Sequence, residues 1–102
     1  MCNPKLTWEQ QPIALFPLGQ IVATPGALEA LDRYAINAAD LIQRHQSGDW
    51  GNVPLGDAEE NMRSVENGWR ILSSYPISDD QNLWIITEAD RSVTTLLLPE
   101  EY

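Results

Sequence analysis

The spacing of apolar residues changes at Gly68, and this change restricts the folds open to the chain. Before Gly68, apolar residues recur every three or four positions, as in amphipathic helices. After it, three runs are rich in β-branched, aromatic and aliphatic residues, which is typical of strands. The runs are 70–75, 83–87 and 93–98, with short polar connections between them. The pattern predicts an α+β domain with a three-stranded antiparallel meander at its C-terminal end.

Two to three helices are predicted to pack on one face of this sheet. Thr24 and Pro25 suit an N-cap and the first helical position, and Asn37 suits a second N-cap. Asp57 is predicted to cap a third helix, and Gly68 lies where that helix should end. The predicted helices are 25–35, 38–47 and 57–67. The apolar stripe of the third is predicted to contain Ala58, Met62, Val65 and Trp69.

The N-terminal part of the chain follows a different pattern. Residues 1–17 contain three prolines and little periodicity, which predicts an extended arm. Residues 18–102 are predicted to form a single domain. Within it, 18–23 is a candidate short strand, weakened by Gly19, that would join one edge of the sheet.

Charge and composition exclude several classes of function. Six basic residues against fifteen acidic ones give a net charge of -9, which repels nucleic acid and anionic membranes and favours a protein partner with a basic surface. Cys2 and His45 are each the only residue of their kind, so we expect no internal disulfide and no zinc site. Too few carboxylates converge for an oxygen-ligated metal and no Gly-rich phosphate loop is recognisable, so we also expect no other metal site and no cofactor. Neither a signal peptide nor a membrane-spanning run is recognisable, so a cytoplasmic location is expected.

His45 is the only histidine, so any mechanism that needs an imidazole would have to use it. With Asp49 four residues on, it could serve a small hydrolase or nuclease-like enzyme. His45 also falls on the apolar stripe of its helix with Leu41 and Ile42, which indicates a partly buried histidine hydrogen-bonded to the backbone. We predict the structural role.

A second candidate catalytic group lies between the last two predicted strands. Glu88 and Asp90 are two residues apart and could converge beside Arg91. The same residues suit a turn, in which Asp90 accepts a hydrogen bond near Ser92 and Arg91 pairs with a neighbouring carboxylate. We favour the turn.

The acidic residues of the third helix are the candidate binding site. If they converge with the pairs 79–80 and 100–101, they would resemble a phosphate backbone and attract a basic groove. The alternative is an ordinary solvated face. The four helical residues are Asp57, Glu59, Glu60 and Glu66. Trp50, together with Trp8, would be a binding hotspot if exposed, and otherwise anchors the glycine-rich loop 48–57.

Three segments carry a resemblance to a known family: LGQIVATPGAL at 18–28, HQSGDWG at 45–51 and WIITEADRSVTTLLLPEEY at 84–102. The chain resembles a family of small bacterial proteins carried largely on plasmids and other mobile elements. The resemblance implies a bacterial cytoplasm and an accessory role, and it supplies no catalytic residues. We therefore expect a non-enzymatic acidic interaction module that acts on a host protein handling nucleic acid.

Overall fold

The structure is a computed structural model and describes residues 13–102. It confirms the α+β class. The part of the predicted arm before Ile13, with Cys2 and Trp8, lies outside the described residues. The elements in chain order are β1 (Gln20–Ala23), α1 (Pro25–Arg33), α2 (Ala38–Gln46), α3 (Leu55–Asn67), β2 (Ile71–Ser78), β3 (Gln81–Thr87), β4 (Val93–Leu97) and the 3-10 turn η1 (Pro99–Glu101).

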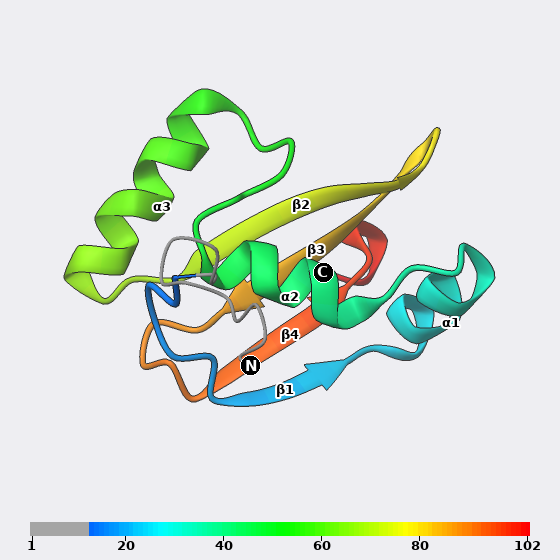
Figure 1. The fold of residues 1–102 in the computed structure, drawn as a ribbon, viewed down its shortest axis with the longest axis horizontal. Helices are drawn as coiled ribbons and strands as arrows, with labels where there is room; N and C mark the ends of the chain where they lie inside the picture. Colours follow the sequence, from blue (N-terminus) through cyan, green and yellow to red (C-terminus); the bar gives the residue numbers. More distant parts are fainter. Residues whose placement is uncertain (1–12) are drawn as a thin grey trace, which may run out of the picture.

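The sheet has four strands in the order β1-β4-β3-β2, so it is not a three-stranded meander alone, and the candidate strand within 18–23 joins it at one edge as β1 (Figure 1). Strands β2, β3 and β4 pair in antiparallel fashion, but β1 joins β4 in parallel and makes the sheet mixed. Gly19 helps to bring β1 in, because its φ is 66° and an added Cβ would lie 2.4 Å from the Arg91 carbonyl oxygen. Gly19 weakens the strand pattern in the sequence, but in the structure it allows the chain at β1 to lie close to the backbone of Arg91.

The first two helices begin where their local caps predict. Thr24 Oγ1 accepts from the Ala27 N–H at 3.1 Å, and Pro25 occupies the first turn of α1. Asn37 Oδ1 accepts from the Ala39 N–H at 2.9 Å at the start of α2. Both interactions lie within three residues along the chain, so the sequence is sufficient to locate them.

The predicted start of α3 is wrong. The helix begins at Leu55 after Pro54, so Asp57 lies in its first turn and is not its N-cap. A carboxylate there still interacts favourably with the helix dipole. The predicted end is confirmed, because Gly68 adopts the left-handed conformation at φ 75° that ends many helices.

The predicted apolar stripe of α3 is wrong at two of its four positions: Ala58 and Val65 pack against the core, but Met62 and Trp69 do not. The side chains buried on this helix are polar, Asn61 and Ser64, whereas Met62 and Trp69 are exposed. Asn61 is inside because its amide meets the edge of β2: its Nδ2 donates to the Leu72 carbonyl at 2.7 Å, and its Oδ1 accepts from the Leu72 N–H at 3.2 Å. The helix is therefore rotated relative to the predicted orientation.

The β2–β3 hairpin is longer than predicted. The polar segment 76–82 was expected to be a connection, but β2 continues to Ser78 and β3 starts at Gln81, leaving a two-residue turn. Ile77 is buried in the apolar core, and this burial favours a strand over a loop for residues 76–78. Pro76 is tolerated because β2 is an edge strand, where a missing N–H breaks no sheet hydrogen bond.

The outer edge of β2 is covered by the chain itself. Beyond the Asn61 contact, the Ser74 N–H donates to the Trp50 carbonyl at 3.1 Å and the Ser74 carbonyl accepts from the Asn52 N–H at 2.8 Å. Gly51 makes this approach possible, since an added Cβ would lie 1.9 Å from the Ser74 carbonyl oxygen. Such cover keeps an edge strand from pairing with another chain.

The helices cover one face of the sheet and enclose two clusters of apolar side chains. The smaller cluster contains Phe16, Trp50 and Ile71 and lies under α3 and the loop before it. The larger cluster joins α1 and α2 to the sheet through Ala27, Ala30, Leu31, Leu41, Tyr75, Ile77, Leu83, Ile85, Leu96 and Leu98.

Candidate functional site

His45 is completely buried between α2 and the sheet. Its Nδ1 lies 2.6 Å from Ser73 Oγ on β2, and its Nε2 lies 2.9 Å from Thr87 Oγ1 on β3. Thr87 Oγ1 lies 2.8 Å from Thr94 Oγ1 on β4, and Thr94 donates to the Leu18 carbonyl at 2.7 Å. A single chain of hydrogen bonds thus ties α2 to three strands and to the segment before β1.

The last member of this chain fixes the direction of the hydrogen bonds from Thr94 back to Nε2 of His45. A carbonyl oxygen only accepts, so Thr94 uses its hydroxyl proton on Leu18. Thr87 therefore donates to Thr94 and accepts from the Nε2–H of His45. The neutral imidazole carries one ring proton, so in that form the Nδ1 atom is unprotonated and accepts from Ser73. The arrangement satisfies both ring nitrogens with a neutral imidazole.

Burial, followed by the nearby charge of Arg91, lowers the pKa of His45 from its ordinary 6.5 to about 4. The ring is enclosed by Phe16 at 5.2 Å and Trp50 at 6.0 Å between ring centroids. With no exposed surface and both nitrogens engaged, the imidazole cannot reach a substrate. The predicted position of His45 against the core is confirmed, but the ring is fully rather than partly buried, and its partners are hydroxyl groups rather than the backbone.

Asp49 is paired with Arg44 and not with His45. The Arg44 Nε lies 2.7 Å from the Asp49 carboxylate, and this hydrogen bond lowers the carboxyl pKa. The Asp49 carboxylate also accepts from the Gly51 N–H at 3.2 Å. The main-chain carbonyl of Asp49 accepts from Tyr75 Oη at 2.7 Å. Asp49 therefore shapes the loop, and the His45–Asp49 pair of the alternative enzyme hypothesis is not formed.

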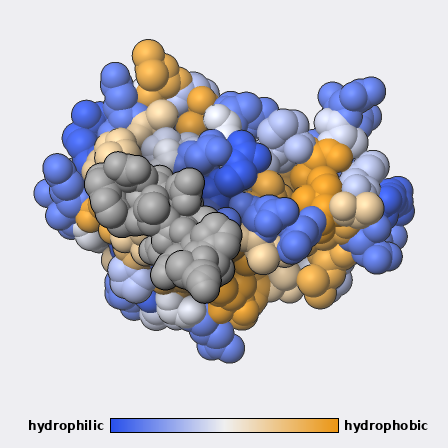
Figure 2. Space-filling view, in the orientation of Figure 1, coloured by the Kyte–Doolittle hydropathy of each residue, from blue (hydrophilic) through white to orange (hydrophobic). Residues whose placement is uncertain are grey.

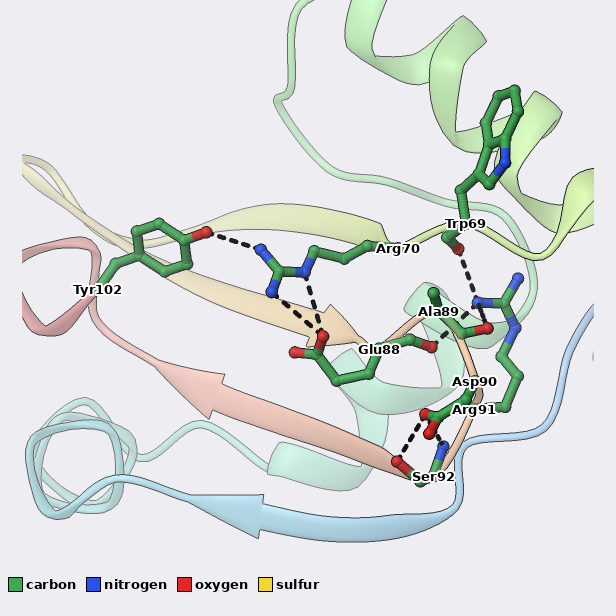
Figure 3. Close-up of polar contacts among 8 residues, drawn as sticks. All are labelled: Trp69, Arg70, Glu88, Ala89, Asp90, Arg91, Ser92 and Tyr102. Carbon is green, nitrogen blue, oxygen red and sulfur yellow. Dashed lines mark hydrogen bonds and ion pairs between the residues drawn. The ribbon is translucent and has the colours of Figure 1, made fainter.

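The cluster of Glu88, Asp90 and Arg91 after β3 is divided among three separate sets of contacts (Figure 3). The Glu88 carboxylate pairs with Arg70 at 3.1 Å, and Arg70 also donates to Tyr102 Oη at 2.7 Å. Asp90 accepts from the Ser92 N–H at 3.0 Å and from its hydroxyl at 2.6 Å, as predicted for a turn. Glu88 and Asp90 therefore do not converge on a common point.

Arg91 does not pair with a carboxylate, which corrects the sequence prediction. It donates to four main-chain carbonyls, those of Ser64, Trp69, Glu88 and Ala89, at 2.7 to 3.3 Å. The Ser64 and Trp69 carbonyls lie at the end of α3, where helix carbonyls need donors and a cation is favoured. Arg91 thus fastens the β3–β4 turn to the C-terminal end of α3.

The four candidate binding carboxylates of α3 are all exposed. They are Asp57, Glu59, Glu60 and Glu66. Glu60 forms an ion pair with Arg63 at 3.2 Å. The other three have no ion pair within residues 13–102. The exposed side of α3 therefore carries uncompensated negative charge.

The remaining acidic groups expected to converge with these lie elsewhere. Asp79 and Asp80 are at the tip of the β2–β3 hairpin, which Figure 1 shows on the opposite side of the molecule from α3. Glu101 caps α1, since its carboxylate accepts from the Gly26 N–H at 3.1 Å and the Leu98 N–H at 2.9 Å. The acidic surface is therefore local to α3 and does not trace an extended phosphate-like path.

Trp50 is 6% exposed, which removes it from the surface where a binding hotspot would have to lie. Its ring stacks on Phe16 with centroids 6.3 Å apart. The alternative interpretation, a tryptophan that anchors the loop, describes this position. Trp8, its expected companion, lies outside the described residues.

The sequence interpretation missed the exposed apolar residues of α3. Leu55, Met62 and Trp69 are 76%, 47% and 46% exposed. Each is seven residues from the next. The sequence shows this spacing, but the prediction places Met62 and Trp69 in the core. The buried Asn61 gave no comparable signal, because its role depends on an edge strand that follows later in the chain.

Two shallow hollows lie between α1, η1 and the β2–β3 hairpin. One has a volume of about 200 Å³ and is lined mainly by Glu29, Arg33 and Leu98. The other, of about 500 Å³, is lined by Tyr34, Asp80 and neighbouring residues. Neither hollow is lined by any of the candidate catalytic residues, so they give no support to the enzyme hypothesis.

No family model, curated protein or solved structure matches the chain. The resemblance to mobile-element proteins therefore stays a prediction. Over the described residues, no helix is long and apolar enough to span a membrane. Residues 13–102 also contain no group of three or more His, Cys, Asp or Glu side chains placed to hold a metal ion.

Proposed function

We propose that the chain is a non-enzymatic interaction module that uses the acidic side of α3 to bind a basic surface on another protein. The observation that carries the proposal is the pair of exposed carboxylates Glu59 and Glu66, which share the outer side of α3 and have no cationic partner within residues 13–102. Asp57 is exposed as well, but it lies on the opposite side of the first turn. The partner class follows from charge complementarity, and the mobile-element resemblance favours a host protein that handles nucleic acid.

The basic side chains support the same conclusion. All five arginines in residues 13–102 are engaged within the chain, four with carboxylates and Arg91 with carbonyls. A protein that binds nucleic acid gains affinity when free cations displace counterions from phosphates. The described part of this chain offers no such free cation, so a basic protein is the better match.

The alternative, a small hydrolase or nuclease-like enzyme, has less support from the geometry. His45 is sealed in the core, and Asp49 is held by Arg44. Glu88 and Asp90 are held by different partners. None of these side chains is free to act with another on a bound substrate.

The test is affinity capture from bacterial lysate by the whole chain and by two variants with equal change of charge. One variant combines Glu59→Lys, Glu60→Lys and Glu66→Lys on α3. The control combines Asp32→Lys, Asp79→Lys and Glu100→Lys, all exposed and away from α3. The unfolding free energy of both should change little, since exposed charges contribute about 0 to 1 kcal/mol each.

The proposal expects the original chain and the control to retain the same proteins at low salt, and the α3 variant to lose them. Added duplex DNA or high salt should release the retained proteins, because both compete for a basic surface. Equal capture by the α3 variant would overturn the proposal. Tight binding of the original chain to duplex DNA in a gel-shift assay would do the same.

A further inference from the structure

The exposed side of α3 carries an apolar stripe as well as negative charge. The stripe consists of Leu55, Met62 and Trp69, of which Leu55 is the most exposed at 76%. Seven residues make nearly two helical turns, so Leu55 and Met62 lie on one side of the helix. Figure 2 shows hydrophobic residues standing out among hydrophilic ones over the first turns of α3.

Contacts on the inner side of α3 hold the stripe outward. Asn61 is bound to both main-chain polar groups of Leu72, and Arg91 is bound to the carbonyls of Ser64 and Trp69. These bonds fix the rotation of the helix about its axis. Trp69 follows the helix end, and Figure 3 shows its indole beside α3, turned away from the sheet.

Two carboxylates run alongside the stripe. Glu59 and Glu66 are also seven residues apart, and each lies four residues after a stripe member, one turn further along the same side. Arg63, the one cation that α3 itself contributes, is paired with Glu60 at 3.2 Å. The surface is therefore an apolar row with an uncompensated acidic row beside it.

We infer that this surface docks an amphipathic helix of a partner protein that carries apolar residues at a seven-residue spacing flanked by lysine or arginine. A partner helix of about 14 residues matches the 13 residues of α3, which span about 20 Å. The inference rests on the proposed function and specifies how the partner is recognised.

The negative charge of this surface disfavours three other ligands: a second copy of the chain, an anionic membrane and a nucleic acid. A second copy of the chain would set Glu59 and Glu66 against the same carboxylates, and both copies carry a net charge of -9. An anionic membrane or a nucleic acid would be repelled in the same way. A basic helix fills the apolar row and neutralises the acidic row together.

The test uses a synthetic helical peptide of about 18 residues, roughly five turns, with leucines every seven residues and lysines beside them. Its control peptide has glutamine in place of each lysine. Binding is measured by calorimetry with the whole chain, with a stripe variant (Leu55→Ala with Met62→Ala) and with a control variant (Leu28→Ala with Ile13→Ala). The control pair is similarly exposed, at 58% and 63%.

The lysine peptide should bind the original chain and the control variant, and its Kd should rise about tenfold or more for the stripe variant. The glutamine peptide should bind about tenfold more weakly than the lysine peptide, with little dependence on salt. Equal affinity of the stripe variant, equal affinity of the glutamine peptide, or no binding to the original chain would overturn the inference. So would a dimer of the original chain in sedimentation that the stripe variant abolishes.

Lysate capture separates this inference from the proposed function. If the charge-reversal variant of α3 loses its retained proteins while the stripe variant keeps them, the stripe inference fails and the acidic module stands. If neither variant loses them, both fail. Because all the altered side chains are exposed, circular dichroism and thermal melts should show that both variants fold.

Discussion

Lowering the pH should weaken this fold in a range set by one buried side chain. His45 is the only histidine, and its pKa in the folded chain is about 4 against an ordinary 6.5. As the pH falls, the unfolded chain therefore takes up a proton on His45 before the folded chain does. The contribution of His45 to stability is complete above pH 6.5 and is lost progressively toward pH 4.

The size of this loss follows from the pKa difference. Each unit of pKa difference corresponds to about 1.4 kcal/mol, so the complete loss is about 3 kcal/mol. At about pH 5, roughly 2 kcal/mol should already be gone relative to about pH 7.5. A domain of this size has an unfolding free energy of about 5 to 15 kcal/mol, so the change is well within reach of measurement.

The assay is urea unfolding followed by tryptophan fluorescence at several pH values between about 7.5 and 5. His45→Gln removes the titrating group, so its unfolding free energy should vary by less than about 0.5 kcal/mol over this interval. The pKa values of Asp49, Asp90 and Glu101 are also lowered, so the unfolding free energy decreases further when these carboxylates are protonated at lower pH. Their effect belongs to the carboxyl range below about pH 5, and the variant retains it as a control.

A proton NMR titration gives an independent check, because a single histidine gives one assignable Hε1 resonance. It should titrate near pH 4 in the folded chain. Two results would contradict a neutral imidazole with both nitrogens hydrogen-bonded. One is an Hε1 titration midpoint near the ordinary 6.5, and the other is an unfolding free energy of His45→Gln that depends on pH as strongly as that of the original chain.

Two further predictions concern how the edge of β2 is covered. Gly51→Ala should destabilise the fold by about 2 kcal/mol or more, because φ is 77° and the new Cβ would lie 1.9 Å from the Ser74 carbonyl oxygen. Gly56→Ala is its matched control: it lies in α3 with nothing within 4 Å, so it should raise the unfolding free energy by about 0.5 to 1 kcal/mol. Asn61→Leu should lower the unfolding free energy by about 1 to 3 kcal/mol in urea titrations, since the N–H and carbonyl of Leu72 lose their partner. An unchanged midpoint for Gly51→Ala or Asn61→Leu would show that the loop and α3 are not needed to close this edge.

The features predicted correctly from the sequence are those that a few neighbouring residues determine. Thr24 and Asn37 cap helices that begin directly after them, and Gly68 ends α3 through its own φ. Asp90 closes a turn onto Ser92, two residues away. In each case both partners lie within a few positions, so local chemistry is sufficient.

The errors occur where a distant segment decides the outcome. Asn61 displaces Met62 from the core because β2 needs its edge bonded, and no local pattern reveals that need. In the candidate site, the burial of His45 follows from its helical stripe, but its hydroxyl partners come from strands. Likewise, Glu88 takes its cation from Arg70, 18 residues earlier.

The parallel pairing of β1 with β4 has a consequence for how the chain acquires its fold. The two strands are joined at Gln20 and Val93, so most of the chain lies between the partners. Closing so long a loop costs entropy before any contact is gained, and folds rich in such contacts form slowly.

During synthesis, β1 therefore has to wait as an unpaired segment until β4 has left the ribosome. The helix that follows it, α1, has its local N-cap in Thr24, but it gains the Glu101 carboxylate at its N-terminus only after the last residues of the chain have been made. The β2–β3 hairpin, with its two-residue turn, can form first and offer the sheet onto which β4 and then β1 are added. A nascent chain stalled before residue 93 should thus leave the apolar strand around Ile21 available to chaperones and proteases.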